Sequence, residues 1–126
     1  IFIPSINAFK SPSLLPSTMS KTGSITSIEL NDKIESGESV QIIDVRPKQD
    51  YLLGHIPGSI NLPLSHFARD ISTITFEPSI VVVCAIGESS LQAIRLLNSY
   101  SAVPQETEIL NLIGGYHHWI FSISPN

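Results

Sequence analysis

Residues 80–83 constrain the fold more than any other part of the sequence. Four consecutive β-branched residues, Ile-Val-Val-Val, favour a short strand that is buried on both faces, as in a parallel sheet. Cys84 follows this run directly, and Gly87 supplies the backbone freedom that a tight loop needs. Apolar residues then recur at helical spacing to about Tyr100, namely Leu91, Ala93, Ile94, Leu96 and Leu97. The pattern predicts a strand, a thiol, a tight loop and a helix.

Cys84 is the clearest candidate nucleophile in this pattern. A thiolate beside a helix N-terminus faces unpaired backbone N–H groups and the positive end of the helix dipole, and both stabilise its charge. We expect Ser89 or Ser90 to cap this helix with a side-chain oxygen. A single cysteine after an apolar strand is also often a small buried hydrophobe. Position alone therefore leaves two alternatives, a reactive thiol and a packing residue.

Composition excludes several classes of function. The chain of 126 residues suits one domain with its own core. Its net charge of −4 argues against nucleic-acid binding, which favours a basic surface. One cysteine excludes an internal disulfide, and no Cys/His spacing matches a zinc site. No apolar run reaches membrane-spanning length, so we expect no membrane contact. The single cysteine favours a reducing compartment, and we expect a cytoplasmic protein without a cofactor.

Residues 1–23 differ in composition from the rest of the chain. They are rich in serine, contain three prolines and include no acidic residue. We expect a disordered or loosely docked arm here, followed by a folded domain over residues 24–126. The sequence opens on Ile1, so Met19 is an alternative start. A remnant of a transit peptide for an organelle such as a plastid is a further alternative.

The remaining segments predict short strands that alternate with helices. Thr26 and Glu29 form a capping-box signature for a helix that ends at Gly37. Further strands are expected at residues 40–45, 59–62 and 108–112. Helical turns are expected at 49–53, 64–71 and 116–121, the last with Trp119 pointing inward. Such alternation favours an α/β fold with a mainly parallel sheet that is covered by helices on both faces.

Three motifs together resemble the rhodanese-like domain family. The first spans residues 42–63 and contains Asp-x-Arg at 44–46, Gly-His-Ile-x-Gly at 54–58 and Asn-x-Pro at 61–63. The second is the loop of residues 84–90, Cys-Ala-Ile-Gly-Glu-Ser-Ser, and the third is Gly114-Gly115 with Trp119. The motifs extend from about Ser24 to Phe121. The resemblance implies a three-layer α/β sandwich with a central sheet of about five short strands.

The resemblance also implies a single-domain sulfurtransferase. In such enzymes a cysteine takes a sulfane sulfur from thiosulfate or another persulfide donor and passes it to a thiol or cyanide, and a protein can serve as donor or acceptor. Cys84 matches the nucleophile of this family. The loop residues Ala85, Ile86, Gly87, Glu88, Ser89 and Ser90 match the substrate cradle, in which backbone N–H groups hold an anionic persulfide. At a strand end, Asp44 and Arg46 favour an ion pair that braces the strand, with a catalytic role as the alternative. In the family pattern His55 braces its turn, with an acid–base role as the alternative.

The loop departs from many family members in its charge. Ser89 stands where many rhodaneses have an arginine, and Glu88 places a carboxylate near the thiolate. A carboxylate there repels an anionic donor, so we expect weak use of thiosulfate or a different donor. A solvent-exposed Glu88 would be largely screened. Lys48 and Arg95 assist donor binding only if the fold brings them to the loop.

Two other classes of function are alternatives. A non-catalytic rhodanese module would serve protein binding or regulation, although the retained Cys84 counts against it. Phosphatase or arsenate-reductase chemistry requires Cys-x5-Arg to clamp a tetrahedral oxyanion, and this chain has Ser90 at the arginine position. His117 and His118 are adjacent on a predicted helical turn and point in different directions, so we expect no metal site.

Overall fold

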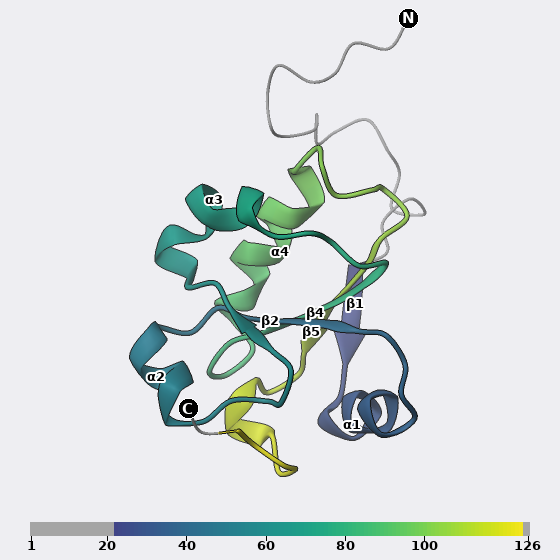
Figure 1. The fold of residues 1–126 in the computed structure, drawn as a ribbon, viewed down its shortest axis with the longest axis vertical. Coiled ribbons are helices and arrows are strands. Elements are labelled where there is room, and N and C mark those ends of the chain that lie inside the picture. Colours follow the sequence, from purple (N-terminus) through teal and green to yellow (C-terminus); the bar gives the residue numbers. More distant parts are fainter. Residues whose placement is uncertain (1–21, 125–126) are drawn as a thin grey trace, which may run out of the picture.

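A five-stranded parallel sheet forms the centre of the molecule, in a computed structural model that describes residues 22–124 (Figure 1). The elements are β1 (Thr22–Ile25), α1 (Ser27–Glu35), β2 (Gln41–Asp44), α2 (Lys48–Leu53), β3 (Ile60–Asn61), η2 (Leu64–His66), α3 (Phe67–Asp70), η3 (Ile71–Thr73), β4 (Ser79–Val83), α4 (Ser90–Ser99), β5 (Glu108–Leu112) and η4 (Tyr116–His118). The strand order is β1-β5-β4-β2-β3, and every pair is parallel. The predicted α/β class is confirmed.

Strand β4 is the middle strand of the sheet and carries the β-branched run. Its residues 80–83 are all fully buried, as the sequence pattern predicts. Val81 is in register with Ile42 of β2 on one side and Leu110 of β5 on the other. Because parallel strands place their carboxyl ends at one edge of the sheet, Cys84 lies at the centre of that edge.

Strand β1 is an element that the sequence analysis did not predict. It pairs with β5 from Thr22↔Ile109 to Ile25↔Leu112, at the edge of the sheet. The strand begins two residues before residue 24, where the folded domain was expected to start. Among the side chains described in β1, Ile25 is the buried one, so no apolar pattern marked the strand. Residues 1–21 of the predicted arm lie outside the described residues.

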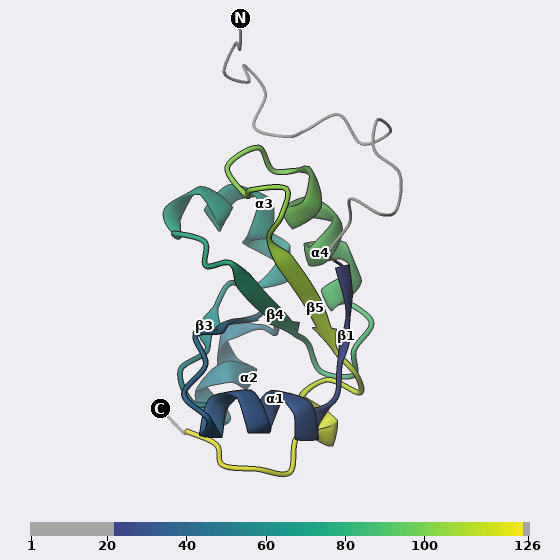
Figure 2. The ribbon, with the colours of Figure 1, turned by 90° about the vertical axis from the view of Figure 1, so that its right-hand side faces the viewer.

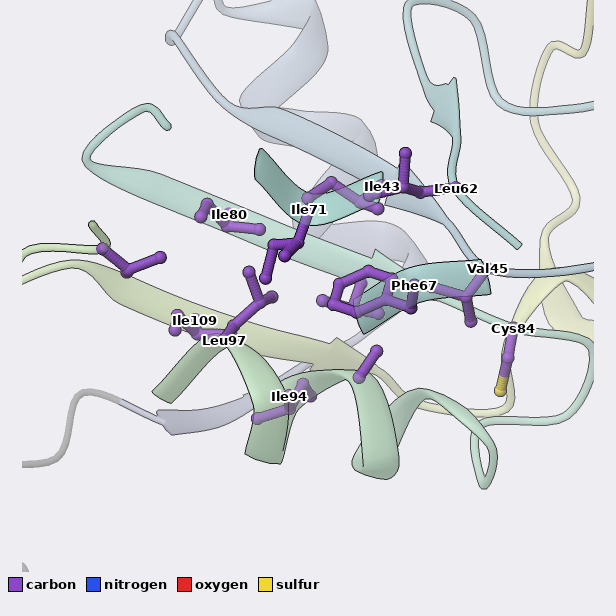
Figure 3. Close-up of a cluster of buried hydrophobic side chains, with 13 residues drawn as sticks. Ile43, Val45, Leu62, Phe67, Ile71, Ile80, Cys84, Ile94, Leu97 and Ile109 are labelled. Atoms are coloured by element: carbon purple, nitrogen blue, oxygen red, sulfur yellow. The ribbon is translucent and has the colours of Figure 1, made fainter. Parts of the chain in front are cut away.

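One face of the sheet packs against α3 and α4. Figure 3 shows side chains from both helices and from the strands meeting in one cluster, which includes Phe67, Leu97, Ile80 and Ile109. Leu91 was predicted on the buried face of α4, but it is 44% exposed. The buried residues of α4 are Ser90, Ala93, Ile94 and Leu97.

The other face of the sheet packs against α1 and the C-terminal turn η4 (Figure 2). Leu30 of α1 is fully buried, and Trp119 is 8% exposed, so its inward position is confirmed. The predicted capping box is present: the Thr26 N–H donates to Glu29 Oε1 at 2.9 Å, and the Glu29 N–H donates to Thr26 Oγ1 at 3.1 Å. Hydrogen bonding with Thr26 lowers the pKa of Glu29. Helices thus cover both faces, as predicted.

Candidate active site

Cys84 lies where the sheet core meets the surface loops. It directly follows β4 and is 2% exposed. Figure 3 shows its sulfur at one end of the apolar cluster, beside the loop that leads into α4. The sulfur therefore has apolar packing on one side and loop backbone on the other.

The loop supplies a backbone hydrogen bond to the sulfur. The Gly87 N–H donates to Cys84 Sγ at an N···S distance of 3.0 Å. Gly87 has a φ of +91°, and an added Cβ would lie 3.0 Å from the Gly114 nitrogen. Both facts favour glycine at this position. Of the backbone amides assigned to the cradle, the Gly87 amide is the one that donates to the sulfur among the described residues.

Ser90 and Asn111 extend this arrangement beneath the loop. Ser90 is fully buried, and its Oγ lies 3.4 Å from Cys84 Sγ. Its hydroxyl donates to Asn111 Oδ1, and Asn111 Nδ2 donates to the Gly87 carbonyl at 3.1 Å. The predicted cap is wrong, because neither serine caps α4: Ser89 is the N-cap residue without a side-chain bond, and Ser90 turns inward to Asn111.

Sequence reasoning missed Asn111. The residue lies on β5 between Leu110 and Leu112, and it is the polar, half-buried position in an otherwise apolar stretch. A polar side chain in a buried strand requires a hydrogen-bonding partner. That requirement marks Asn111 as unusual, but only the parallel pairing of β4 with β5 identifies Ser90 and Gly87 as its partners.

The Gly114-Gly115 motif holds the C-terminal turn against the Cys84 loop. The Tyr116 N–H donates to the Cys84 carbonyl at 2.7 Å, and the His117 N–H donates to the Ala85 carbonyl at 3.0 Å. Gly115 has a φ of +63°, and a Cβ on it would lie 2.4 Å from the Cys84 carbonyl oxygen. The motif thus permits a backbone approach that a side chain would prevent.

Two neighbouring cavities open beside the loop. The first has a volume of about 260 Å³ and is lined by Val45, Arg46, Pro47, Pro63, Leu64, Ser65, Cys84, Ala85 and Ser89. The second has a volume of about 310 Å³ and is lined by Arg46, Asp50, Leu53, Gly54, Ala85, Tyr116 and His117. Arg46 and Ala85 line both. Ile86, Glu88, Lys48 and Arg95 line neither cavity, and all four are exposed.

Asp44 and Arg46 form a buried ion pair at the end of β2. Arg46 Nη2 lies 2.9 Å from Asp44 Oδ2, and the two side chains are 7% and 1% exposed. Arg46 also donates to the Gly54 carbonyl at 2.8 Å, and its guanidinium lies 3.9 Å from the centre of the Tyr116 ring. The pair therefore joins β2 to two later segments of the chain.

His55 lies in the turn that follows α2, outside both cavities. Its ring stacks on Tyr51 with centroids 3.7 Å apart, and its Nδ1 lies 2.8 Å from the Tyr51 carbonyl. Its backbone forms a β-bridge with Ser124. These contacts engage the imidazole with α2 and the C-terminal segment rather than with Cys84.

The histidines and helices of the described residues bear on metal binding and membrane insertion. Over residues 22–124, no three His, Cys, Asp or Glu side chains gather in a way that could hold a metal ion. His118 Nδ1 faces the Gly114 carbonyl at 3.0 Å, while His117 lines the second cavity. In the same part of the chain, every helix is too short or too polar to cross a bilayer.

Known proteins resemble this chain in sequence. The sequence profile described as "Rhodanese-like domain" matches residues 26–121. The chain is 34% identical over 92 residues to "Thiosulfate sulfurtransferase GlpE" of Pseudoalteromonas translucida, covering 73% of this chain and 80% of that protein. It is 30% identical over 96 residues to "Adenylyltransferase and sulfurtransferase uba4" of Ogataea parapolymorpha, covering 75% of this chain and 24% of that protein.

Solved structures show the same fold. The crystal structure of a rhodanese-like domain protein from Staphylococcus aureus superposes with a TM-score of 0.70 and 26% identity, and the match covers 82% of this chain and 98% of that one.

Several curated relatives are longer proteins. The chain spans less than half the length of the first three that it matches, with shares of 26%, 24% and 45%.

Proposed function

This chain belongs to the rhodanese-like domain family, and on that premise we propose that it is a sulfurtransferase in which Cys84 carries a sulfane sulfur. One observation supports the proposal above all: the single thiol of the chain lies beside a cavity, with a backbone N–H of its loop 3.0 Å from the sulfur. A backbone N–H stabilises an anionic sulfur without adding a charged side chain. Relatives named as sulfurtransferases support the same class.

The proposed reaction has two steps that balance in atoms and charge. The Cys84 thiolate attacks the sulfane sulfur of the donor, a new S–S bond forms, and the S–S bond of the donor breaks. With thiosulfate, sulfite leaves with the electron pair, and Cys84 becomes an anionic persulfide. Cyanide or a thiolate then attacks the outer sulfur, and the Cys84 thiolate is released as the leaving group.

The residues around the cavity favour donors other than thiosulfate. Arg46 is the charged side chain in the lining, and its Nε and Nη2 already bind Asp44. The remaining lining is apolar or carries serine hydroxyls. An anion with two charges gains little from such a site, because it loses its hydration shell without a free cation to replace it. We propose that a persulfide of a small thiol or of a protein is the preferred donor.

A protein is a second candidate to deliver sulfur to Cys84 or to accept sulfur from it. Ile86 in the loop is 53% exposed, and Leu53 and Ile113 nearby in the fold are 80% and 50% exposed. Relatives include a protein named as a putative sulfur carrier. We therefore include a protein among the proposed donors and acceptors. A cytoplasmic location stays a prediction.

Mass spectrometry of the intact protein tests the proposal. The chain is incubated with thiosulfate or with glutathione persulfide, and Cys84→Ser serves as the control. We expect a gain of one sulfur atom that cyanide or dithiothreitol reverses and that the variant lacks, with faster loading from glutathione persulfide. If Cys84 stays unmodified with both donors, the enzyme proposal is wrong, and the non-catalytic module becomes the better interpretation.

A further inference from the structure

Four groups close a ring of hydrogen bonds beneath the Cys84 loop. The thiol of Cys84 donates to Ser90 Oγ at 3.4 Å, and the Ser90 hydroxyl donates to Asn111 Oδ1. Asn111 Nδ2 donates to the Gly87 carbonyl at 3.1 Å, and the Gly87 N–H donates back to Cys84 Sγ at 3.0 Å. The ring connects the end of β4, its loop, the start of α4 and β5.

The Gly87 carbonyl fixes the direction of this ring. A carbonyl oxygen only accepts hydrogen bonds, so the NH₂ group of Asn111 must face it. The oxygen of Asn111 then faces Ser90 and takes the one proton that a serine hydroxyl can donate. Toward the sulfur, Ser90 consequently presents a lone pair, which suits a thiol and opposes a thiolate or an anionic persulfide.

Burial makes this choice of partner consequential. Ser90 is fully buried and cannot turn to bulk water. Within residues 22–124, its hydroxyl has Cys84 Sγ and Asn111 Oδ1 as side-chain partners. A buried polar atom that loses its partner carries a free-energy cost. The Ser90 proton therefore binds either Asn111 or an anionic sulfur, and each choice deprives the other acceptor.

We propose that Asn111 is a positioning residue that acts on Cys84 through Ser90, an inference that rests on the sulfurtransferase function proposed above. Its carbonyl holds the Ser90 proton away from the sulfur, and its NH₂ group holds the Gly87 peptide so that the N–H points at the sulfur. When an anionic sulfur forms, the Ser90 hydroxyl must leave Asn111 in order to stabilise it. Asn111 thus limits how strongly Ser90 favours the anionic forms of Cys84.

Alkylation rates measure this coupling directly. Cys84 is the only cysteine of the chain, so iodoacetamide reports on one thiol. Only the thiolate reacts, and the rate at one fixed pH therefore follows the thiolate fraction. Four proteins form a double-mutant cycle: the wild type, Ser90→Ala, Asn111→Leu and the double variant.

The proposal predicts strong coupling between the two positions. With Asn111 present, Ser90→Ala slows alkylation by at most about twofold, because the hydroxyl is held by the asparagine. In the Asn111→Leu background, Ser90→Ala slows it by about tenfold, because the freed hydroxyl donates to the thiolate and charge-assisted hydrogen bonds are stronger. A ratio of these two effects of about three or more supports the proposal. A smaller ratio overturns it and leaves Asn111 with a structural role.

Two further variants separate the acceptor role from general loosening of the loop. Asn111→Asp retains an oxygen that can accept the Ser90 proton, so Ser90→Ala again has an effect of about twofold or less in that background. Asn61 braces the neighbouring loop through Nδ2 at 2.9 Å from the Asp44 and Arg46 carbonyls, without contact to Ser90. In the Asn61→Leu background, the Ser90→Ala effect should match that in the wild type; an effect enlarged to about tenfold would overturn the proposal.

Thermal unfolding monitors the folding of every variant. If Asn111→Leu does not fold, Asn111→Val replaces it, because valine favours strands and likewise offers no acceptor. Alkylation needs no sulfur donor, so it tests Asn111 separately from sulfur transfer. If the two substitutions have independent effects on the alkylation rate and sulfur loading is normal, only the role proposed for Asn111 is wrong. If the effects of the two substitutions on the alkylation rate are coupled but Cys84 takes up no sulfur, only the proposed sulfurtransferase function is wrong.

Discussion

Two loops follow neighbouring strands at the same edge of the sheet, and their buried groups differ in charge. After β2, Asp44 and Arg46 are both buried and bind each other through several hydrogen bonds. After β4, Cys84 has a backbone N–H and a serine hydroxyl as its polar neighbours. A buried charge persists only when it is fully paired. The charged side chains of the β2 loop are therefore bound to each other, whereas the hydrogen-bond partners of Cys84 among the described residues carry no charge.

Both loops are braced by an asparagine from the next strand, and the braces also differ. Asn61 uses its NH₂ group on the Asp44 and Arg46 carbonyls, so its hydrogen bonds bind only backbone. Asn111 binds the Gly87 backbone with its NH₂ group but gives its oxygen to the Ser90 hydroxyl. A hydroxyl can rotate, whereas a peptide group in a packed turn cannot. Asn61 thus binds backbone groups of the β2 loop, whereas the role proposed for Asn111 gives the β4 loop a proton that can change partners.

Replacing Arg46 should have the largest effect on stability. Arg46→Met leaves the buried Asp44 carboxylate without its partner, and loss of one member of a buried ion pair typically costs about 3–5 kcal/mol. Urea denaturation followed by circular dichroism measures the free energy of unfolding. Cys84→Ser, by contrast, should change that free energy by about 1 kcal/mol or less while it abolishes sulfur loading.

A double variant tests whether the unpaired charge causes this loss. Asn at position 44 carries no charge, so Asp44→Asn combined with Arg46→Met should recover a large part of the stability that Arg46→Met loses. A loss of less than about 1 kcal/mol in the single variant would show that the ion pair does not hold the β2 loop. That result would contradict the proposed difference between the two loops, in which a buried ion pair stabilises the β2 loop.

Gly115→Ala should damage the β4 loop more than the β2 loop. A Cβ there meets the Cys84 carbonyl oxygen at 2.4 Å and the Ala85 carbonyl carbon at 2.7 Å, in a backbone with a φ of +63°. We expect a loss of about 2–4 kcal/mol from the steric overlap and the backbone strain together. Alkylation of Cys84 by iodoacetamide should change as well, because the turn that carries Tyr116 is displaced from the loop.

Gly58→Ala is the matched control for this effect. Gly58 has a φ of +83°, but a Cβ on it would meet nothing within 4 Å. It therefore isolates the cost of the left-handed backbone, about 1–2 kcal/mol, without a clash. Equal losses in the two variants, with equal alkylation rates, would contradict a close approach between the C-terminal turn and the Cys84 loop.

The sequence predicted the position of the Cys84 loop because the signals for it are local. The β-branched run of residues 80–83, the cysteine and Gly87 lie close together in the sequence, and the run and the glycine each indicate a backbone conformation. Strand β1 had no such signal. Its pairing with β5 is made by main-chain groups that every residue possesses, and Ile25 is its buried apolar side chain. Backbone pairing between distant segments leaves little trace in composition.

Side-chain partners were harder to predict for a related reason. Ser90 was expected to cap α4, since a serine near a helix start commonly does so. The fold places Asn111 of the adjacent strand within reach, and this long-range partner replaces the local one. The Asn111 side chain forms hydrogen bonds with residues that lie 21 and 24 positions away in the sequence. Only the order of the strands in the sheet reveals that contact.

Glu88→Gln should have the smallest effect and concerns the charge of the β4 loop itself. Glu88 is exposed and lines neither cavity, so its repulsion of thiosulfate acts through solvent. We expect sulfur loading from thiosulfate to rise by roughly twofold at low ionic strength and the gain to disappear as salt increases. Glu106→Gln, an exposed carboxylate in the loop before β5, should leave loading unchanged. An equal or lower rate for Glu88→Gln at low salt would show that the loop carboxylate does not oppose anionic donors. The proposed weak use of thiosulfate would then rest on the cavity lining alone, in which Arg46 is the cation among residues 22–124 and is bound to Asp44.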